Sequence, residues 1–335
     1  MRLLVCGGAG FMGSHFIKYI LDKYPDYFVV NYDKLTYAGN LENLREVEND
    51  ERYVFVKGDI CDKESVDGAI QKYAIDVIIN YAAETHVDRS IMDPTAFLRT
   101  GIFGTYNLLE ATKNFNLKKM VQVSTDEVFG SIEAGEFTEK SPFAPNSPYA
   151  ASKAGADLLC RSYFATYQTP VVVTHSCNFM GSFQYPEKVI PLFITNLLEN
   201  KLVPLYGEGS NVREWIQASD HCRAIDAILH FAEGGTVYNI GSGQEISNFE
   251  LTKLILKYLD KGEEMIERVK DRAGHDRRYA IDHRKLTEEL GWKPEKSFEV
   301  GLKETVEWYK NNEWWWKKIK NGDYLKYYES QYTTR

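Results

Sequence analysis

A tyrosine and a lysine four residues apart offer acid–base chemistry in this chain of 335 residues. Tyr149 and Lys153 form the pattern Tyr-x-x-x-Lys, and a helix would place both side chains on one face, about one turn apart. An ammonium group beside a phenol stabilises the phenolate, which would lower the pKa of the tyrosine so that it can accept a proton from a hydroxyl group. The pattern alone is also common on solvated helices, so its meaning depends on its surroundings.

A second polar group follows an apolar run that predicts a strand at Met120–Ser124. The carboxyl ends of strands are where α/β sheets bind ligands, so the Thr125 hydroxyl could hold a reacting oxygen there. Neighbouring side chains on a strand point apart, so Asp126 and Glu127 reach one ligand only if the backbone turns. With a turn, the site holds a tyrosine base, an acid and a further base, as elimination of water requires. Without one, the carboxylates only solvate a loop or begin a helix.

A glycine-rich turn indicates a dinucleotide site. Gly7, Gly10 and Gly13 follow the first apolar run and open a helical stretch, where glycines permit a tight turn against a pyrophosphate. Asp33 lies where a carboxylate would accept hydrogen bonds from the adenosine ribose, which favours NAD over NADP. Lys34 follows and could instead meet a 2′-phosphate. A structural turn followed by a solvated aspartate is the alternative.

Two further pairs of residues follow predicted strands and are expected to contact the cofactor. Asp59 and Ile60 come after the third strand and are placed to meet the adenine. Ala82 and Ala83 come after the fourth strand, where small side chains would let the cofactor lie close to the backbone. Small residues also occur at such positions for packing alone.

The elements that would position these residues alternate along the first half of the chain. β-Branched runs separated by helical stretches predict an α/β fold, a doubly wound parallel Rossmann sheet with a smaller mixed α/β lobe. We expect residues 1–176 to form the NAD-binding domain, with a return near 219–231, and residues 177–335 to form mainly the substrate-binding lobe. The predicted strands are Leu3–Cys6, Phe28–Tyr32, Tyr53–Lys57, Val77–Tyr81, Met120–Ser124 and Val171–Thr174, and the predicted helices are Gly13–Tyr24, Lys63–Tyr73, Thr95–Asn114 and Pro148–Tyr167.

Composition argues against several classes of partner. The formal net charge of −8 makes non-specific binding to nucleic acid unfavourable, and no apolar run is long enough to cross a membrane. The five cysteines are scattered and include no Cys-x-x-Cys pair, so we expect neither a disulfide framework nor a metal site. This pattern fits a protein of the reducing cytoplasm.

Taken together, these motifs resemble the epimerase/dehydratase group of the extended short-chain dehydrogenase/reductase family along nearly the whole chain. Within that group, the Thr-Asp-Glu triplet is typical of sugar-nucleotide 4,6-dehydratases and distinguishes them from epimerases. The segments that carry the resemblance are Gly7–Gly13, Asp33–Asn40, Ala82–Ser90, Ser124–Glu127, Ser147–Lys153, Pro186–Lys188 and Asp271–Tyr279.

The resemblance implies a lyase reaction on dTDP-glucose in which NAD is regenerated. Tyr149, supported by Lys153 and Thr125, would remove the proton of the C4 hydroxyl while a hydride passes from C4 to NAD. Glu127 would then abstract the C5 proton and Asp126 would protonate the departing C6 hydroxyl, after which the hydride returns to C6. The resemblance also implies a homodimer formed through the Thr95–Asn114 and Pro148–Tyr167 helices.

The same resemblance implies two sets of binding residues. Arginine suits the diphosphate because its fork matches phosphate oxygens, although Arg272 could equally belong to a solvated charge cluster. The further cofactor contacts would be Phe11, Met12, Leu35, Thr36, Thr85, Thr100, Tyr149 and Lys153, and the nucleotide-sugar contacts would be Thr85, Asn178, Glu187, Lys188, Val189, Pro204, Tyr206, Arg213, Asn248, Arg272 and His275.

The chain departs from the usual pattern of the family at several positions, and other functions remain open. Phe179 stands where a second asparagine is usual, His175 where arginine is usual, and Gly101 where asparagine is usual. One alternative is a 4,6-dehydratase for UDP-glucose or another nucleotide sugar. A second is an NAD-dependent 4-epimerase, which would not need the Asp-Glu pair. A third is a non-enzymatic NAD sensor, which would not need Tyr149 or Lys153.

Overall fold

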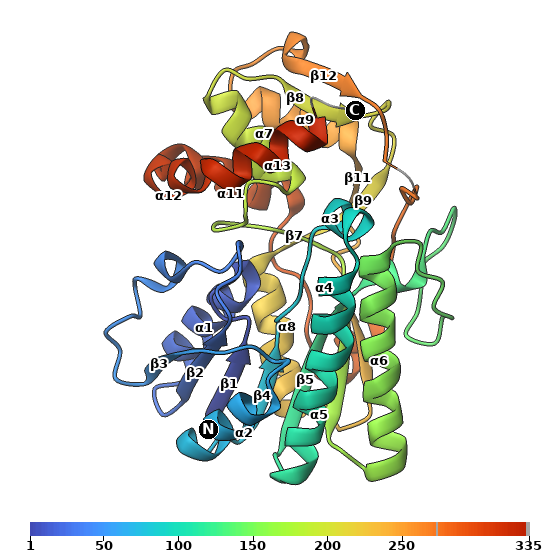
Figure 1. The fold of residues 1–335 in the computed structure, drawn as a ribbon. Helices are drawn as coiled ribbons and strands as arrows, with labels where there is room; N and C mark the ends of the chain where they lie inside the picture. Colours follow the sequence, from blue (N-terminus) through green and yellow to red (C-terminus); the bar gives the residue numbers. More distant parts are fainter. Residues whose placement is uncertain (273, 333–335) are drawn as a thin grey trace.

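The computed structural model describes residues 1–272 and 274–332 and is built around a parallel sheet (Figure 1). Within the described residues this sheet has seven strands in the order β10-β6-β5-β4-β1-β2-β3, with every neighbouring pair parallel. The predicted doubly wound α/β fold is confirmed. The strands are β1 (Arg2–Cys6), β2 (Phe28–Asp33), β3 (Tyr53–Lys57), β4 (Val77–Asn80), β5 (Lys119–Thr125), β6 (Val171–Ser176) and β10 (Val237–Ile240).

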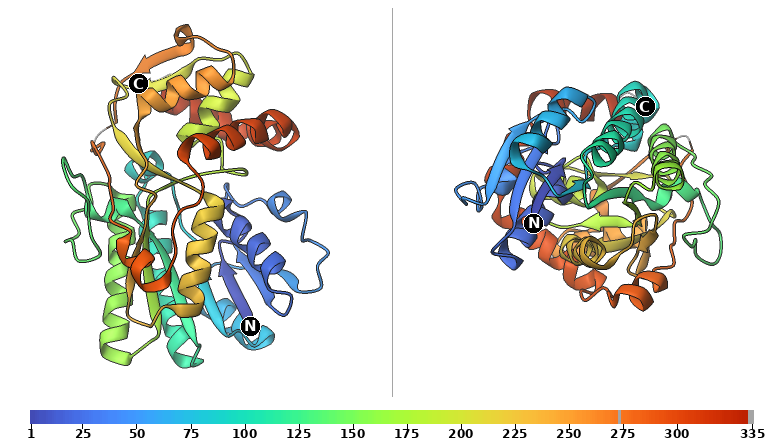
Figure 2. Two further views of the ribbon diagram at one scale, coloured as in Figure 1. Left: turned by 180° about the vertical axis from the view of Figure 1, so that it is seen from behind. Right: turned by 90° about the horizontal axis from the view of Figure 1, so that it is seen from below.

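Helices cover both faces of this sheet, as the view from below shows (Figure 2). Successive residues of β1 alternate between two cores: Leu3 and Val5 pack in one, and Leu4 and Cys6 in the other. The strands are therefore buried on both sides, which explains their continuous apolar runs. The helices of this part are α1 (Phe11–Lys23), α2 (Lys63–Tyr73), α3 (Val87–Met92), α4 (Thr95–Leu98), α5 (Thr105–Asn114), α6 (Pro148–Tyr167) and α8 (Ala218–Phe231).

The predicted elements agree closely with the observed ones, with two additions. The predicted helix Thr95–Asn114 consists of α4, a π-helical segment η2 (Arg99–Gly104) and α5. Strand β10, which pairs with β6, was missed because it is only four residues long and follows a turn-rich stretch. Helix α8 packs against α1 and β10 joins the sheet. The chain beyond residue 176 therefore contributes one strand and one covering helix to the sheet domain.

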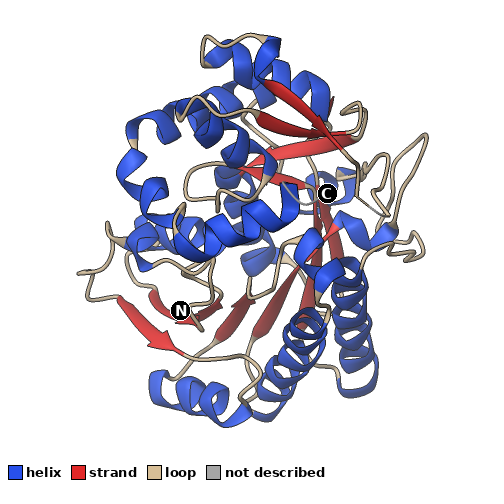
Figure 3. Cartoon of the chain, turned by 45° about the horizontal axis from the view of Figure 1, so that its top comes forward, coloured by secondary structure: helices blue, strands red, loops and turns tan. Residues whose placement is uncertain are grey.

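A smaller lobe lies beyond the carboxyl ends of the central strands (Figures 1 and 3). Its core gathers apolar side chains of several helices together with the buried Trp315 and Trp316, so the aromatic tail packs in this lobe. No helix in the described part of the chain is both long and apolar enough to span a membrane. The lobe contains β7 (Asn178–Met180), β8 (Val203–Tyr206), β9 (Val212–Gln217), β11 (Glu245–Ser247), β12 (Ile266–Val269), α7 (Val189–Leu198), α9 (Asn248–Tyr258), α11 (Phe298–Asn311), α12 (Glu313–Ile319) and α13 (Gly322–Tyr332), while α10 (Arg284–Leu290) contacts β10 and α8.

Candidate active site

A cleft runs along the carboxyl edge of the sheet, beneath the smaller lobe. It brings together the glycine turn, the ends of β2, β4 and β5, the first turn of α6 and the segment before α7. The predicted site residues that line it are Gly7, Gly10, Phe11, Met12, Gly13, Asp33, Lys34, Thr36, Asp59, Ile60, Ala82, Ala83, Thr85, Thr100, Thr125, Asp126, Glu127, Tyr149, Lys153, Asn178, Glu187 and Lys188.

The glycine turn has no room for side chains at two of its positions. A Cβ atom on Gly7 would stand 2.6 Å from the Ala82 backbone nitrogen, and Gly7 has a φ of +74°. A Cβ atom on Gly13 would collide with the Gly7 carbonyl oxygen. The backbone of the turn is therefore exposed directly to the cleft, where the N-terminus of α1 begins. This is a cradle that a pyrophosphate can approach closely.

Asp33 is held at the end of β2 by two backbone amides. The Ala9 N–H donates to Oδ2 at 2.9 Å and the Leu35 N–H donates to Oδ1 at 2.8 Å. Burial raises the pKa of Asp33, and these two hydrogen bonds oppose the rise. The Lys34 ammonium lies 2.8 Å from the Asp59 carboxylate, so its charge already has a partner. The Leu35 side chain, which was expected to contact the cofactor, is not among the lining residues.

The backbone turns where the acid pair requires it to turn. Strand β5 ends at Thr125 and the short 3₁₀ helix η3 (Asp126–Phe129) begins with the next residue. The Thr125 hydroxyl accepts from the Glu127 N–H at 3.3 Å and donates to Asp126 Oδ1 at 3.2 Å. Both carboxylates consequently line the same cleft as Tyr149, which satisfies the geometric condition set by the sequence.

The two carboxylates lie in different electrostatic surroundings. Asp126 is 2% exposed, and burial, followed by the charges of Glu127 and Glu214, raises its pKa well above the usual range. Burial also raises the pKa of Glu127, but Arg272, Arg213 and Lys188 oppose this rise. Asp126 thus has a pKa raised well above its usual range, and Glu127 is the carboxylate whose rise three cations oppose.

The largest effects on the Tyr149 phenol come from burial and the neighbouring carboxylates, and the expected effect of Lys153 stays a prediction. Burial, followed by Glu127 and Asp126, raises the pKa of Tyr149, and the opposing contribution comes from a hydrogen bond with Thr125. Lys153 Nζ instead donates to the Val123 carbonyl oxygen at 2.6 Å, and burial lowers the pKa of this ammonium. The sequence placed the two side chains on one helix face but could not show that the carboxylates dominate the charge around the phenol.

Glu187 is a buried carboxylate whose two oxygens are both engaged. Arg89 Nε lies 3.0 Å from Oε2, and the Tyr37 hydroxyl donates to Oε1 at 2.7 Å. The Arg89 guanidinium also stacks over the Tyr37 ring at 4.2 Å. Sequence reasoning singled out neither Arg89 nor Tyr37, although both lie in segments that carried the family resemblance. Lys188 Nζ donates to the Thr85 carbonyl oxygen.

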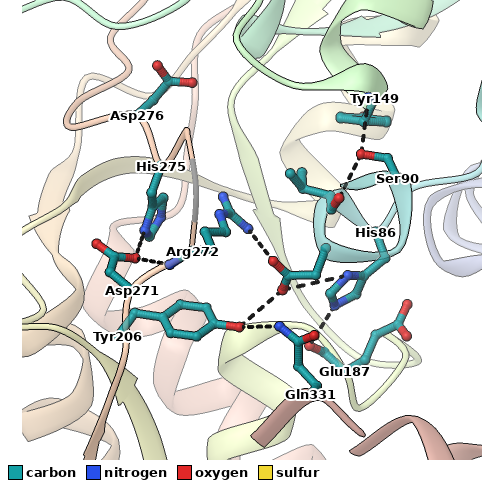
Figure 4. Close-up of polar contacts among 12 residues, drawn as sticks. His86, Ser90, Tyr149, Glu187, Tyr206, Asp271, Arg272, His275, Asp276 and Gln331 are labelled. Atoms are coloured by element: carbon teal, nitrogen blue, oxygen red, sulfur yellow. Dashed lines mark hydrogen bonds and ion pairs between the residues drawn. The ribbon is translucent and has the colours of Figure 1, made fainter. Parts of the chain in front are cut away.

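The remaining predicted substrate residues belong to the smaller lobe and are not among the residues that line this cleft. Arg213 and Arg272 nevertheless act on Glu127 by charge. Arg272 and His275 lie close to Tyr206, and the Arg272 guanidinium points towards α3 (Figure 4). The other three are Val189 at the start of α7, Pro204 on β8 and Asn248 at the start of α9.

Several lining residues were missed. Ser176 ends β6 and Cys177 follows it, so the rule that sites gather at the carboxyl ends of strands could have found them. Phe179 lines the cleft at the position noted for its missing asparagine, and its ring centroid lies 4.6 Å from that of His221. The other lining residues that were not predicted are Tyr32, Tyr37, Ala38, Gly39, Gly58, Tyr81, Glu84, Val123, Ser124, Gln184 and Tyr185.

Comparison with known proteins gives consistent matches over nearly the whole chain. The family model described as GDP-mannose 4,6 dehydratase matches residues 4–305. A dTDP-glucose 4,6-dehydratase of Streptomyces niveus is 49% identical over 327 residues, which cover 96% of this chain and 97% of the relative. A low-salt glycan biosynthesis protein of Haloferax volcanii is 50% identical over 309 residues, which cover 92% of this chain and 98% of the relative.

Solved structures agree. The dTDP-glucose 4,6-dehydratase DesIV of Streptomyces venezuelae, with NAD and dTDP bound, is similar with a TM-score of 0.93 and 48% identity, covering 96% of this chain and 100% of that one. A Thermus thermophilus UDP-glucose 4-epimerase in complex with NAD is less similar, with a TM-score of 0.86 and 29% identity, covering 93% of this chain and 100% of that one.

Proposed function

Because the chain belongs to the GDP-mannose 4,6-dehydratase family, we propose that it converts dTDP-glucose to dTDP-4-keto-6-deoxyglucose with loss of water. The observation that carries the proposal is the turn between β5 and η3, which sets Asp126 and Glu127 in one cleft with Tyr149. An epimerase needs the tyrosine and the threonine but not two carboxylates with opposed electrostatic surroundings.

NAD is the cofactor that fits the residues present. The cradle at Gly7 and Gly13 suits a pyrophosphate, and Asp33 is held where its carboxylate can accept hydrogen bonds from the hydroxyl groups of a ribose. The pairing of Lys34 with Asp59 supports NAD over NADP, because that ammonium is already neutralised. NAD held there would supply the hydride acceptor for oxidation at C4 and the hydride donor for reduction at C6.

Tyr149 is proposed to accept the proton of the C4 hydroxyl, with Thr125 as its hydrogen-bond partner. A phenol with a raised pKa is a strong base once ionised. It therefore depends on positive charge and on the Thr125 hydrogen bond to ionise at working pH. Lys153, anchored on the Val123 carbonyl oxygen, is proposed to supply this positive charge from the same helix face.

Glu127 and Asp126 are proposed to divide the elimination step between them. The C5 proton becomes acidic beside a C4 ketone, and Glu127, ionised with the help of three cations, takes it. Asp126 keeps its proton in a buried setting and delivers it to the C6 oxygen, which leaves as water. One environment thus gives a base and the other an acid, although the two residues are adjacent in the sequence.

The nucleotide diphosphate is proposed to bind the cationic residues above the acid pair. Arg213 is 5% exposed and Arg272 is mostly buried, so both present desolvated guanidinium groups with a geometry that matches phosphate oxygens. Lys188 supplies a third positive charge at the same end of the cleft. The other residues proposed to contact the substrate are Thr85, Asn178, Glu187, Val189, Pro204, Tyr206, Asn248 and His275.

A homodimer is proposed through the helices named in the sequence analysis. Apolar side chains on η2, α5 and α6 are unusually exposed, with Phe103 64%, Leu158 55%, Tyr167 54% and Tyr106 42% accessible. An exposed apolar surface of this kind on neighbouring helices is typical of a protein interface. Residues 1–176, with the return near 219–231, are proposed as the NAD-binding domain and residues 177–335 as mainly the nucleotide-sugar lobe. The cytoplasmic location also stays a prediction.

The test is incubation of the purified chain with dTDP-glucose and, separately, with UDP-glucose, followed by mass spectrometry of the sugar nucleotides. Loss of one water from dTDP-glucose is the expected result. Loss from UDP-glucose alone would reassign the nucleotide. A product of unchanged mass and galactose configuration would indicate an epimerase, and an unchanged sugar would indicate a protein that only binds NAD.

A further inference from the structure

Asp88 on α3 is a buried carboxylate that the acid–base mechanism does not use. It is 2% exposed, and besides the neighbouring His86 its partners come from the smaller lobe. The Tyr206 hydroxyl donates to Oδ2 at 3.2 Å, and Arg272 Nη1 lies 3.7 Å from Oδ1 (Figure 4). Tyr206 in turn accepts from the Gln331 amide of α13 at 2.8 Å.

The charge balance at Asp88 depends on Arg272. A buried carboxylate needs a cationic partner, since its desolvation is otherwise costly. His86 Nδ1 lies 4.0 Å from Oδ2, but burial, reinforced by Lys188 and Arg89, holds the pKa of this imidazole well below its usual range. The Arg272 guanidinium is therefore the cation that pairs with Asp88, and Lys188 also acts on it by charge.

Arg272 faces a second carboxylate as well. Burial raises the pKa of Glu127, and Arg272 is the cation that opposes this rise most strongly, ahead of Arg213 and Lys188. Among the described residues, Arg272 Nε has no hydrogen-bond partner, so the guanidinium is held by charge and by packing rather than by a full set of hydrogen bonds. A guanidinium that pairs with one carboxylate and acts on another by charge changes its effect on the second when the first is lost.

Helix α3 also contacts the catalytic helix. The Tyr149 N–H donates to the Ser90 hydroxyl at 3.2 Å, and that hydroxyl donates to the Val87 carbonyl oxygen at 2.6 Å. One short helix therefore fixes the first turn of α6 at Ser90 and the cationic segment of the smaller lobe at Asp88. Helix α3 therefore lies between Tyr149 and Arg272 and contacts both (Figure 4).

We propose that Asp88 is a positioning residue for the elimination step: it holds the Arg272 guanidinium, which acts on Glu127 by charge, and so keeps Glu127 a strong enough base to take the C5 proton. This inference rests on the proposed function. Asp88 is not among the residues that line the cleft. The charged and titratable groups that face Glu127 are Arg272, Arg213, Lys188, Asp276, Asp126, Tyr149 and Tyr279.

The variant Asp88→Asn removes the competing carboxylate and keeps a similar shape. Arg272 is then left with Glu127 as its carboxylate partner, which favours the ionised form of Glu127 and weakens it as a base. We expect the elimination rate to fall by about tenfold, and the acidic limb of its pH dependence to move to lower pH. The rate of NADH formation from dTDP-glucose should stay within about twofold of that of the parent chain. Single-turnover NADH absorbance and quenched product analysis across a pH series separate the two steps.

The matched control is Asp226→Asn, which also removes a buried carboxylate but lies on α8, paired with Lys23. It is expected to leave both steps and the acidic limb unchanged. Asp88→Glu, which keeps the charge, is expected to restore the position of the limb. If Asp88→Asn fails to fold, Tyr206→Phe removes the hydroxyl that donates to Asp88. The carboxylate then draws Arg272 more strongly, and the limb is expected to move to higher pH by a smaller amount.

An unchanged limb, or an equal loss in both steps, would overturn the role of Asp88 and leave the proposed function intact. Failure of the parent chain to release water from dTDP-glucose would instead overturn the proposed function itself.

Discussion

At the scale of single residues, neighbours in the sequence have acquired different chemistry from partners that are distant in the sequence. Asp126 and Glu127 are the same type of acid, but the cations that act on Glu127 come from residues 188, 213 and 272. The sequence predicted both carboxylates and left their division of labour to the family resemblance. It could not give the electrostatic reason, because that reason depends on the smaller lobe folding over the end of β5.

Glu127→Gln is expected to separate oxidation from elimination. The amide cannot accept the C5 proton, so NADH should form from dTDP-glucose and persist, while release of water falls by about 100-fold or more. Stopped-flow absorbance and product analysis measure the two steps. The control is Glu250→Gln, an exposed N-terminal residue of α9 outside the cleft, which should behave as the parent. Full dehydratase activity in Glu127→Gln would remove this residue from its role.

Thr125→Val tests the hydrogen bond to the tyrosine. Since this bond lowers the pKa of Tyr149 against the effect of burial, its loss raises that pKa further. A higher pKa leaves less phenolate at a given pH, so the rising limb of the oxidation step should move to higher pH by roughly one unit. The pH dependence of single-turnover NADH formation measures the shift. A limb at the same or lower pH would contradict the assignment of Tyr149 as the base.

At the scale of elements, the alternating pattern predicted the sheet because strands and helices of this kind bury apolar residues at regular intervals. Tyr53–Lys57, Lys63–Tyr73 and Pro148–Tyr167 have the predicted bounds. The π-helical turn Arg99–Gly104 and the four-residue strand β10 have no such signature, since each depends on what it packs against. The 3₁₀ turn at Asp126 could not be predicted either, because the sequence showed only that a turn was needed for both carboxylates to reach one ligand.

Gly13→Ala tests the cradle at the start of α1. The added methyl group would collide with the Gly7 carbonyl oxygen, which should displace the turn and weaken NAD binding by about tenfold or more. Equilibrium titration with NAD measures this loss. Gly68→Ala in α2 is the control, since its Cβ meets nothing within 4 Å; it should bind NAD normally and gain up to about 1 kcal/mol of stability. Unweakened binding in Gly13→Ala would place the pyrophosphate elsewhere.

At the scale of the whole molecule, the contacts between the lobes were beyond sequence reasoning. Asn43 accepts from the Trp315 indole N–H at 2.9 Å, and Asp88 faces Arg272, although each pair is far apart along the chain. Such pairs depend on how two separately packed cores meet. Contacts between two copies of the chain are equally hard to predict. The sequence alone could not show which apolar residues of η2, α5 and α6 belong to the core and which to an interface.

The pair of substitutions Phe103→Asp and Leu158→Asp tests the proposed dimer. Buried charges on the apolar helix face should convert a dimeric parent into a monomer, as measured by light scattering coupled to size exclusion. Phe231→Asp, on α8 at a residue that is 71% exposed, is the control and should stay dimeric. A monomeric parent, or a double variant that remains dimeric, would reject this interface.

The central claim is that Tyr149, Asp126 and Glu127 act on one hexose, and the reaction of the parent chain with dTDP-glucose in D₂O tests it most directly. The mechanism removes the C5 proton to a carboxylate that exchanges with solvent, returns the C4 hydride to C6 and then protonates C5 from that carboxylate. The product should therefore weigh one water less than the substrate and carry a single deuterium, at C5. A product that retains the water, or a dehydrated product without deuterium at C5, would contradict the account.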